Sequence, residues 1–241
     1  MAGRAAEPEV IWARPERAGR GPRPAYSRAD IAAAAVRIAD ADGIDAVSMR
    51  RVAGELGCGT MSLYNYVPRK EDLYELMVDA VSGEYELSEA AVGGDWYAGM
   101  LGLGRQTRDI LRRHPWLTRV MSTGHAFSPN ALRYLEHCLG VLDGLAAPQG
   151  TKMELIAMVN GTAMTAVAHE IAMAERARGL PWSEEQEQRV RSAYLHGQLA
   201  DGAYPRLARV MAEGPAPGDP DESYERALRR LLDSFRREPA P

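Results

Sequence analysis

Apolar residues recur three and four positions apart along most of this 241-residue chain, and clusters of proline and glycine interrupt the pattern at helical lengths. Such spacing places apolar side chains on one face of a helix, whereas no stretch shows the strict alternation of a half-buried strand. The apolar residues are mostly Ala, Leu, Val and Met, and aromatic residues make up only 7% of the chain, which also favours helices. The pattern predicts an all-α fold.

The helical pattern divides the chain into three parts. Residues 1–26 hold four prolines among glycines and arginines, and are predicted to form a disordered basic arm without a packed core. Residues 27–72 are predicted to form a three-helix head, and residues 73–237 a larger helical body. The first 70 residues carry 11 Lys and Arg against 8 Asp and Glu, and the rest carry 18 against 25. This asymmetry favours a polyanion at the head, although random scatter would give similar counts.

The head contains two short helical segments joined by a glycine-containing turn. A serine three residues before an aspartate has the spacing of a capping box, and predicts a first helix over 27–42. Ser48 is the next N-cap candidate and predicts a second helix over 48–56, which ends at Gly57 because glycine adopts the left-handed conformation easily. A third helix is predicted over 60–66. The second and third segments together have the arrangement of a helix-turn-helix.

In a helix-turn-helix, the second of the paired helices enters the major groove of DNA by its N-terminal end. The first turn of the third segment offers Thr60, Met61 and Ser62, and Asn65 follows one turn later. Hydroxyl groups can bond several base edges, methionine can contact a thymine methyl group, and asparagine can form two hydrogen bonds with adenine. Taken alone, the same residues are also typical of the polar face of a surface helix.

The sequence around these residues, GELGCGTMSLYNYVPRKEDLYELM, closely resembles the helix-turn-helix of the tetracycline-repressor (TetR) family. The resemblance lies in a Leu-Gly pair, a small turn, a Leu-Tyr pair and a lysine before the next helix, in this order. One position departs from it, because Gly59 stands where many members have a serine or threonine cap, and glycine caps a helix less well than serine. The matching positions are Leu56, Gly57, Leu63, Tyr64, Val67, Lys70 and Leu73.

The resemblance implies a set of contacts with the DNA backbone. It implies that Tyr64 and Lys70 contact phosphates, Lys70 from the start of the connecting helix, where unpaired backbone N–H groups also favour an anion. Ser48 is expected to do the same at the start of the second helix. Arg50, on the solvent side of that helix, resembles a position that in the family can reach DNA, and the contact is expected either at the backbone or at a guanine edge. Tyr66 is either a further phosphate contact or a packing residue against the connecting helix.

The stretch from Trp96 to Arg236 resembles the C-terminal ligand-binding domain of the same family, in HPWLTRVM, SPNALRYLEHCLGVL and YERALRRLLDSF. The resemblance implies a homodimeric transcriptional regulator, by the habit of the family a repressor, which a small molecule releases from pseudo-palindromic operator DNA. No cofactor is implied.

The dimer is expected to form through two helices of the body. The helix near 151–178 is apolar nearly all round, so it must be buried on two fronts, one of them a partner subunit. The helix near 221–237 is the second expected contributor. A two-fold dimer would present its two recognition helices to half-sites about 34–36 Å apart, one turn of DNA.

Polar residues among the apolar segments of the body suggest a small-molecule site. Polar groups inside an apolar cavity orient a ligand, so a largely apolar effector is expected. Each of these residues taken singly is also consistent with a hydrogen-bonded core or interface position, and methionine with core filling. The candidate ligand-binding residues are Met77, His125, Asn130, Tyr134, His137, Asn160, Met164, Thr165 and His169.

Enzymatic patterns are incomplete in this chain. His169-Glu170 lacks the second histidine of an HExxH zinc motif, since Met173 stands in its place. The two cysteines, Cys58 and Cys138, have no metal-binding spacing, so neither an enzyme nor a metal protein is expected. The alternative function is a helical protein-interaction module that does not bind DNA specifically. No run reaches about 18 uninterrupted apolar residues, so a cytoplasmic protein without a membrane span is expected.

Overall fold

The computed structural model describes residues 10–14, 26–120, 127–214 and 219–236, without the side chain of Glu184. Within these ranges the regular elements are helices and none is a strand, which confirms the all-α prediction. The α-helices are α1 (Arg28–Asp42), α2 (Met49–Glu55), α3 (Thr60–Tyr64), α4 (Lys70–Ser82), α5 (Trp96–Arg113), α6 (Leu117–Val120), α7 (Pro129–Val141), α8 (Gln149–Gly179), α9 (Glu184–Ala200), α10 (Pro205–Glu213) and α11 (Pro220–Arg236).

Local signals explain where the helices of the head begin and end. Ser27 and Asp30 form the predicted capping box: the Asp30 N–H donates to the Ser27 hydroxyl over 3.1 Å, and the Ser27 N–H donates to the Asp30 carboxylate over 2.8 Å. The Ser48 hydroxyl caps α2 by accepting from the N–H of Arg51 over 3.2 Å. Gly57 ends the first half of the helix-turn-helix with a φ of +68°, in the left-handed region that favours glycine.

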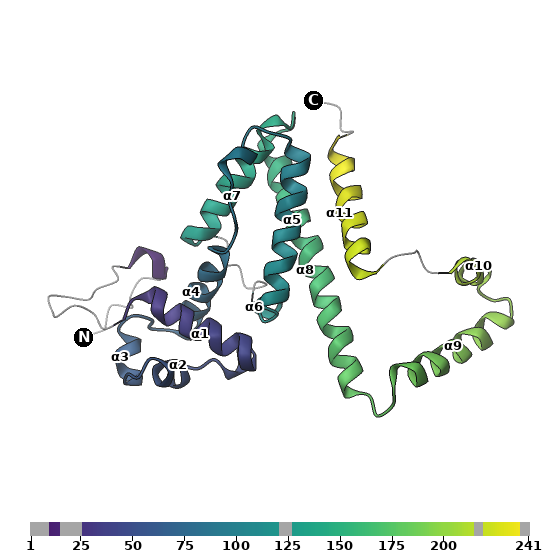
Figure 1. Ribbon diagram of the computed structural model, residues 1–241, viewed down its shortest axis with the longest axis horizontal. Coiled ribbons are helices and arrows are strands. Elements are labelled where there is room, and N and C mark those ends of the chain that lie inside the picture. Colours follow the sequence, from purple (N-terminus) through teal and green to yellow (C-terminus); the bar gives the residue numbers. More distant parts are fainter. Residues whose placement is uncertain (1–9, 15–25, 121–126, 215–218, 237–241) are drawn as a thin grey trace, which may run out of the picture.

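Helix α4 joins the head to the body. It packs against α1 on one side and against α7 on the other, and Leu73 and Met77 on it are fully buried. Figure 1 shows α1 to α3 gathered at one end of the molecule, with α4 leading from them towards α7. The head therefore sits on the body through a continuous apolar core.

The body is a layered bundle in which α5 packs against α8 and α11, and α7 packs against α4, α5 and α8 (Figure 1). Helices α5, α8 and α11 approach closely at Gly104 of α5, where a Cβ atom would lie 2.6 Å from a methyl group of Leu228 and 3.2 Å from one of Val159. The Tyr224 hydroxyl also donates to the Gly104 carbonyl over 2.7 Å. The absence of a side chain at this glycine lets the three helices meet.

Helix α8 is long and apolar enough to cross a membrane by length and composition, and is the one such helix in the described ranges. A core helix of a soluble protein passes the same test. One face of α8, with Leu155, Ile156, Val159, Ala163 and Val167, is buried against its own chain. The chain itself therefore buries one of the two sides that were predicted to be buried. The other side is exposed, with Met153, Met158 and Met173 on the surface.

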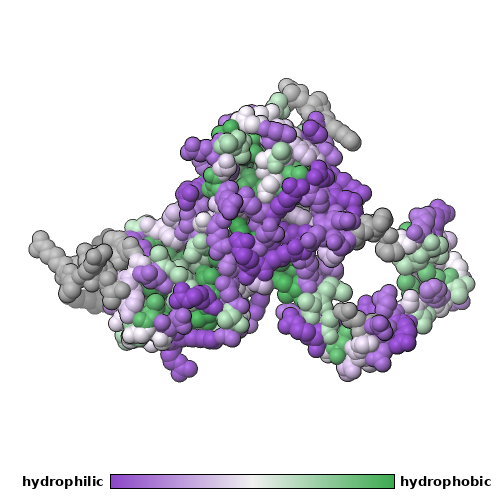
Figure 2. All heavy atoms as spheres, viewed as in Figure 1, coloured by the Kyte–Doolittle hydropathy of each residue, from purple (hydrophilic) through white to green (hydrophobic). Residues whose placement is uncertain are grey.

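Helices α9 and α10 extend away from the bundle, as Figure 1 shows. Glu187 of α9 accepts from Arg176 of α8 over 3.0 Å, and α10 buries none of its residues. Figure 2 shows pale and green atoms gathered on this projecting part. Apolar side chains are exposed along α9 and α10 and in the turn before α9, where Trp182 lies. They are Trp182, Val190, Tyr194, Tyr204, Leu207, Val210 and Met211.

The structure corrects the expectation of an N-terminal arm without a packed core. Residues 11–13 form a single 3₁₀ turn, and Ile11 is fully buried. The guanidinium of Arg28 donates to the carbonyls of Ile11 and Arg14 over 2.9 and 3.0 Å, so the backbone of this segment has partners on the head. Residues 1–9 and 15–25 lie outside the described ranges.

The predicted end of the third helix is also wrong, because α3 ends at Tyr64 rather than Tyr66. Helix α7 ends at Val141, where the chain tightens into a 3₁₀ turn over Leu142–Gly144.

Candidate nucleic-acid interface and ligand-binding region

Helix α3 presents one face to solvent and is anchored by the opposite face. Leu63 is fully buried, whereas Met61 is 77% exposed and Tyr64 is 43% exposed. Ser62 and Asn65 are exposed on the same side, and Thr60 begins the helix half-buried. The five predicted DNA-contacting residues of this segment are therefore held on a short helix whose outer surface no described residue covers.

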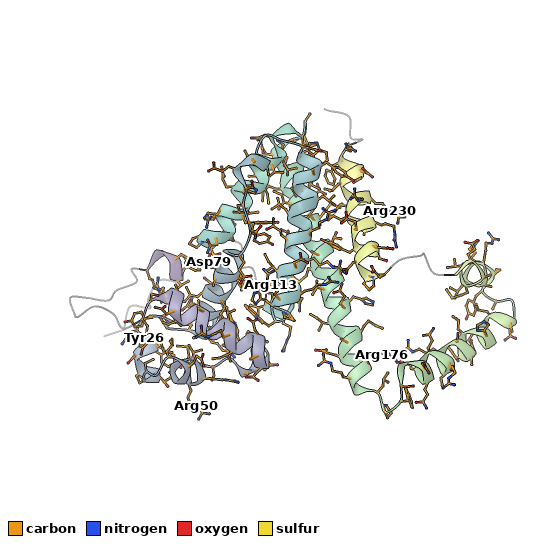
Figure 3. The ribbon with its side chains drawn as sticks, viewed as in Figure 1. Tyr26, Arg50, Asp79, Arg113, Arg176 and Arg230 are labelled. Atoms are coloured by element: carbon orange, nitrogen blue, oxygen red, sulfur yellow. The ribbon has the colours of Figure 1, made fainter. Side chains whose placement is uncertain are left out.

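Helix α2 lies beside α3 and exposes Ser48 and Arg50. Arg50 points away from the head at its outer edge (Figure 3). Its neighbour Arg51 is ion-paired with Asp42 of α1, whereas the structure gives the Arg50 guanidinium no hydrogen bond or ion pair with the described residues. Arg50 thus keeps its five N–H donors available to a polyanion.

The start of α4 completes this surface. Lys70 is the first residue of the helix and is exposed, with its ammonium 5.2 Å from the centre of the Tyr74 ring. Tyr66 is half-buried and packs against the hydrophobic core. Arg69 is ion-paired with Asp72, to whose carboxylate its Nε donates over 3.0 Å.

The head meets the body at a polar cluster around Asp40 of α1. One carboxylate oxygen of Asp40 lies 2.7 Å from the indole nitrogen of Trp116 and 2.7 Å from Nδ1 of His114. His114 and Trp116 are both buried, in the segment between α5 and α6. Asp45 accepts from Arg119 of α6 over 2.7 Å. The segment between α5 and α6, and Arg119 of α6, are therefore bonded directly to the head.

A network of polar side chains lies inside the body, where α5, α7 and α8 converge. The hydroxyl of Tyr134 donates to the side-chain oxygen of Asn160 over 2.7 Å. The hydroxyl of Tyr85 donates to Thr107 over 3.0 Å, and Thr107 lies 3.4 Å from the same Asn160 oxygen. The two tyrosine rings pack together with their centres 4.3 Å apart and their planes tilted by 34°. Two of the predicted ligand-binding residues, Tyr134 and Asn160, are thus brought together.

This interior site carries no charge at neutral pH. Burial raises the pKa of Tyr85 to about 12, and burial also raises the pKa of Tyr134 well above its ordinary value. Burial raises the pKa of the nearby Cys138 thiol to about 12. The amide nitrogen of Asn160 has no hydrogen-bond partner among the described residues. The network therefore consists of neutral hydroxyl and amide groups.

A separate groove of about 640 Å³ lies between α8 and α11. Thr165 and His169 line it, so these two predicted ligand-binding residues face away from the interior network. Its remaining lining residues are Met158, Gly161, Thr162, Ala166, Glu170, Pro220, Ser223, Tyr224 and Ala227.

The other predicted ligand-binding residues are spread over the body. Met77 is fully buried in α4, and Met164 is half-buried on α8. Asn130 is the second residue of α7 and binds Asp79 of α4, to whose carboxylate its backbone N–H donates over 2.7 Å. His137 is half-buried on α7, and burial lowers its pKa. His125 lies outside the described residues.

Sequence reasoning missed Tyr85 and Thr107. Thr107 had a usable signal, because it falls at helical spacing with Leu103, Ile110 and Leu111, a polar residue on an apolar face. Tyr85 had none, since it lies in the connection between α4 and α5, where no periodic pattern exists.

Residues 31–77 match the family described as bacterial regulatory proteins, tetR family, and residues 90–237 match the tetracyclin repressor-like C-terminal domain. The chain is 34% identical over 227 residues to the HTH-type transcriptional repressor DrrR1 of Streptomyces coeruleorubidus, covering 94% of this chain and 83% of that one. It is 31% identical to an HTH-type transcriptional regulator of Saccharopolyspora erythraea, covering 93% and 90%.

Among solved structures, the chain resembles the Streptomyces coelicolor TetR family protein ActR in complex with actinorhodin. The TM-score is 0.72 with 25% sequence identity, over 87% of this chain and 95% of that one. Together, the two family matches cover the helix-turn-helix surface and three members of the interior polar network, Thr107, Tyr134 and Asn160. The chain belongs to the TetR family of bacterial regulatory proteins and is a DNA-binding transcriptional regulator.

Proposed function

We propose that the protein is a cytoplasmic, homodimeric repressor that binds a pseudo-palindromic operator through residues 27–72 and leaves it when a small molecule binds residues 73–237. The exposed outer face of α3, held on the buried Leu63, is the observation that carries this proposal. It needs no catalytic step and no cofactor. The identity of the relatives as transcriptional repressors and regulators supports it.

On this proposal the contacts divide into two groups by chemistry. Thr60, Met61, Ser62 and Asn65 of the exposed α3 face reach the base edges of the major groove. Ser48, Tyr64 and Lys70 contact phosphates, and Arg50 contacts either a phosphate or a guanine edge. Tyr66 packs partly against the core and is the weaker candidate for a phosphate contact. The N-terminus of α4 adds unpaired N–H groups that favour an anion beside Lys70.

Homodimerisation uses the exposed face of α8 together with α11. The groove between these helices and the exposed Met153 and Met158 supply apolar surface that a second copy would bury. Gly161 and Thr165 are exposed on the same helix, and small side chains permit close approach of two helices. The membrane-length composition of α8 is explained by this double burial, so no membrane partner is needed.

The effector is a largely apolar molecule with hydroxyl or carbonyl groups. It is expected to enter beside the packed rings of Tyr85 and Tyr134 and to bind the free amide nitrogen of Asn160. ActR, with a similar fold, has been solved in complex with actinorhodin, which supports a small-molecule effector for this chain.

Release follows if the effector favours a spacing of the two heads that does not fit the operator. The ties from Trp116 and His114 to Asp40 connect the body to α1, so a shift at the end of α5 moves the head. A hundredfold release requires about 2.7 kcal/mol of differential affinity between the two states.

The test begins with selection of duplexes from a random library by the full-length protein, at moderate salt with excess heparin. The expected result is one enriched inverted repeat. Enrichment of no sequence, with heparin competing as well as DNA, would leave the helical protein-interaction module as the function.

The effector arm of the test uses the selected duplex and actinorhodin, followed by other aromatic compounds. Compounds that release the wild-type protein should release a Gln198→Ala variant as well, because Gln198 is exposed on α9 and belongs neither to the interior network nor to the groove between α8 and α11. They should act much more weakly on Asn160→Ala. Equal release of both variants would remove the interior network from the effector site.

A further inference from the structure

Helix α3 has little to hold it in place by itself. It has five residues, and Gly59 at its N-cap supplies no side-chain hydrogen bond. A helix this short is not stable in isolation, because too few hydrogen bonds offset the cost of ordering its backbone. Its placement against DNA must therefore come from its neighbours.

The turn before α3 is held by Tyr26. The Tyr26 hydroxyl donates to the carbonyl of Leu56 over 2.8 Å. Leu56 is the C-cap of α2 and stands directly before the Gly57–Gly59 turn. Tyr26, labelled in Figure 3, thus fixes the carbonyl from which the chain turns into α3.

The chain after α3 is held by Arg28. Its Nε donates to the carbonyl of Tyr66 over 3.4 Å, two residues past the end of α3. Its Nη1 donates to the carbonyls of Ile11 and Arg14 over 2.9 and 3.0 Å. The planar guanidinium fixes these acceptors in one geometry. The exit of α3 is therefore tied to the N-terminal segment.

The N-terminal segment is itself anchored. Ile11 is fully buried and Trp12 packs partly buried against the hydrophobic core. An apolar side chain buried on the head gives residues 10–14 a fixed position, so Arg28 joins two ordered parts of the protein rather than a loose tail.

We propose that Tyr26 and Arg28, with the anchor at Ile11, are positioning residues that set the placement of α3 and so the selectivity of DNA binding. They act through the Leu56 and Tyr66 carbonyls and do not touch bases. All three precede residues 31–77, which the family match covers, so the DNA-reading unit of this chain extends towards its N-terminus. The inference rests on the proposed role of α3 in reading bases.

The test compares each positioning variant with a matched control in the full-length protein. Tyr26→Phe removes only the hydroxyl, and its control is Tyr97→Phe, because the Tyr97 hydroxyl donates to a main-chain carbonyl in the body over 3.3 Å. Arg28→Ala is compared with Arg37→Ala, which removes the same charge from α1. In the wild type, Arg37 binds the side chain of Glu55 of α2 rather than a main-chain carbonyl next to α3.

The readout is the ratio of two affinities, for the duplex selected by the wild type and for a random duplex of equal length at the same salt. A smaller fraction of folded protein lowers both apparent affinities by the same factor, and the loss of a charge weakens binding to both duplexes. A change in the ratio of the two affinities therefore reports misplacement of α3. For Tyr26→Phe the ratio should fall by about 2- to 12-fold per head, the range of one neutral hydrogen bond.

Arg28→Ala should lower the ratio further, and both controls should leave it at the wild-type value. Wild-type ratios in both positioning variants would overturn the inference. Failure of the wild type to select any duplex is a different result, because it overturns the proposed function itself.

Discussion

Two glycines of α5, two positions apart, offer a direct test of how the body is packed. A Cβ atom at Gly104 would lie 2.6 and 3.3 Å from the two methyl groups of Leu228 and 3.2 Å from a methyl group of Val159. Leu228 and Val159 are both fully buried, so neither can swing aside into solvent. A Cβ atom at Gly102 would meet no atom within 4 Å. The variants Gly104→Ala and Gly102→Ala therefore differ in whether the added methyl group meets the core.

The magnitude follows from two known effects. Replacing a helical glycine by alanine favours the helix by about 0.8–1.0 kcal/mol, and this gain is common to both variants because both glycines lie within α5. Forcing an extra methyl group into a filled core costs about 1–3 kcal/mol. Gly102→Ala should be more stable than the wild type, and Gly104→Ala less stable than Gly102→Ala by about 1–3 kcal/mol.

The assay is thermal unfolding followed by circular dichroism, at one protein concentration because subunit association shifts the midpoint. For a chain of this size the difference corresponds to a gap of about 2 to 12 °C between the two midpoints. Equal midpoints would mean that α5, α8 and α11 do not meet at Gly104.

Three further variants probe DNA binding, coupling and pH dependence. Lys70→Ala should lower the slope of log affinity against log salt by about 0.9 for each phosphate that the protein no longer neutralises, and by about twice that for a dimer, in a fluorescence anisotropy titration. Asp40→Ala removes the shared acceptor of His114 and Trp116, so the ratio of operator affinities without and with the effector should fall towards one. Glu170→Gln should lose stability in urea unfolding above about pH 4.5, with a gap from the wild type that closes at lower pH.

The sign of the pH effect follows from the surroundings of Glu170. Burial raises the pKa of Glu170, but hydrogen bonds from Arg112 and Arg108 lower it, and the pKa in the folded protein lies below the usual 4.5. Its stabilisation is thus present above that value and is lost as pH falls through the lowered one. A gap between Glu170→Gln and the wild type that persists at low pH would contradict this.

The predictions for Lys70→Ala and Asp40→Ala can each be contradicted by one result. An unchanged salt slope would remove Lys70 from the residues that bind phosphates. An Asp40→Ala variant that is released by the effector as fully as the wild type would show that the head is coupled to the body elsewhere, for example through Asp45 and Arg119.

Much of the fold follows from local signals. The capping box at Ser27, the N-cap at Ser48 and the left-handed Gly57 fix the helices of the head, because each depends on residues within a few positions of one another. The N-terminal anchor was missed for the opposite reason. Its proline-rich composition indicates disorder, whereas the burial of Ile11 and the bonds from Arg28 depend on segments far along the chain.

The candidate sites divide in the same way. The exposed face of α3 follows from periodicity around Leu63, since one buried residue fixes the orientation of a short helix. The side of α8 that is buried within its own chain could not be predicted from the sequence. Apolar residues occur all round this helix, so periodicity does not distinguish one side from the other. Asn160 consequently lies in the interior network, while Thr165, five residues later, lies on the outer groove.

The central claim is that the exposed turn of α3 reads base edges, and Met61, 77% exposed at its outer surface, tests it most directly. The measurement is a scan of single base-pair changes across the selected duplex, with affinities for the wild type and for Met61→Ala at one salt concentration. The variant should lose discrimination at one position in each half-site and keep the wild-type salt slope, because its phosphate contacts are intact. Identical base preferences for the two proteins at every position would contradict the claim.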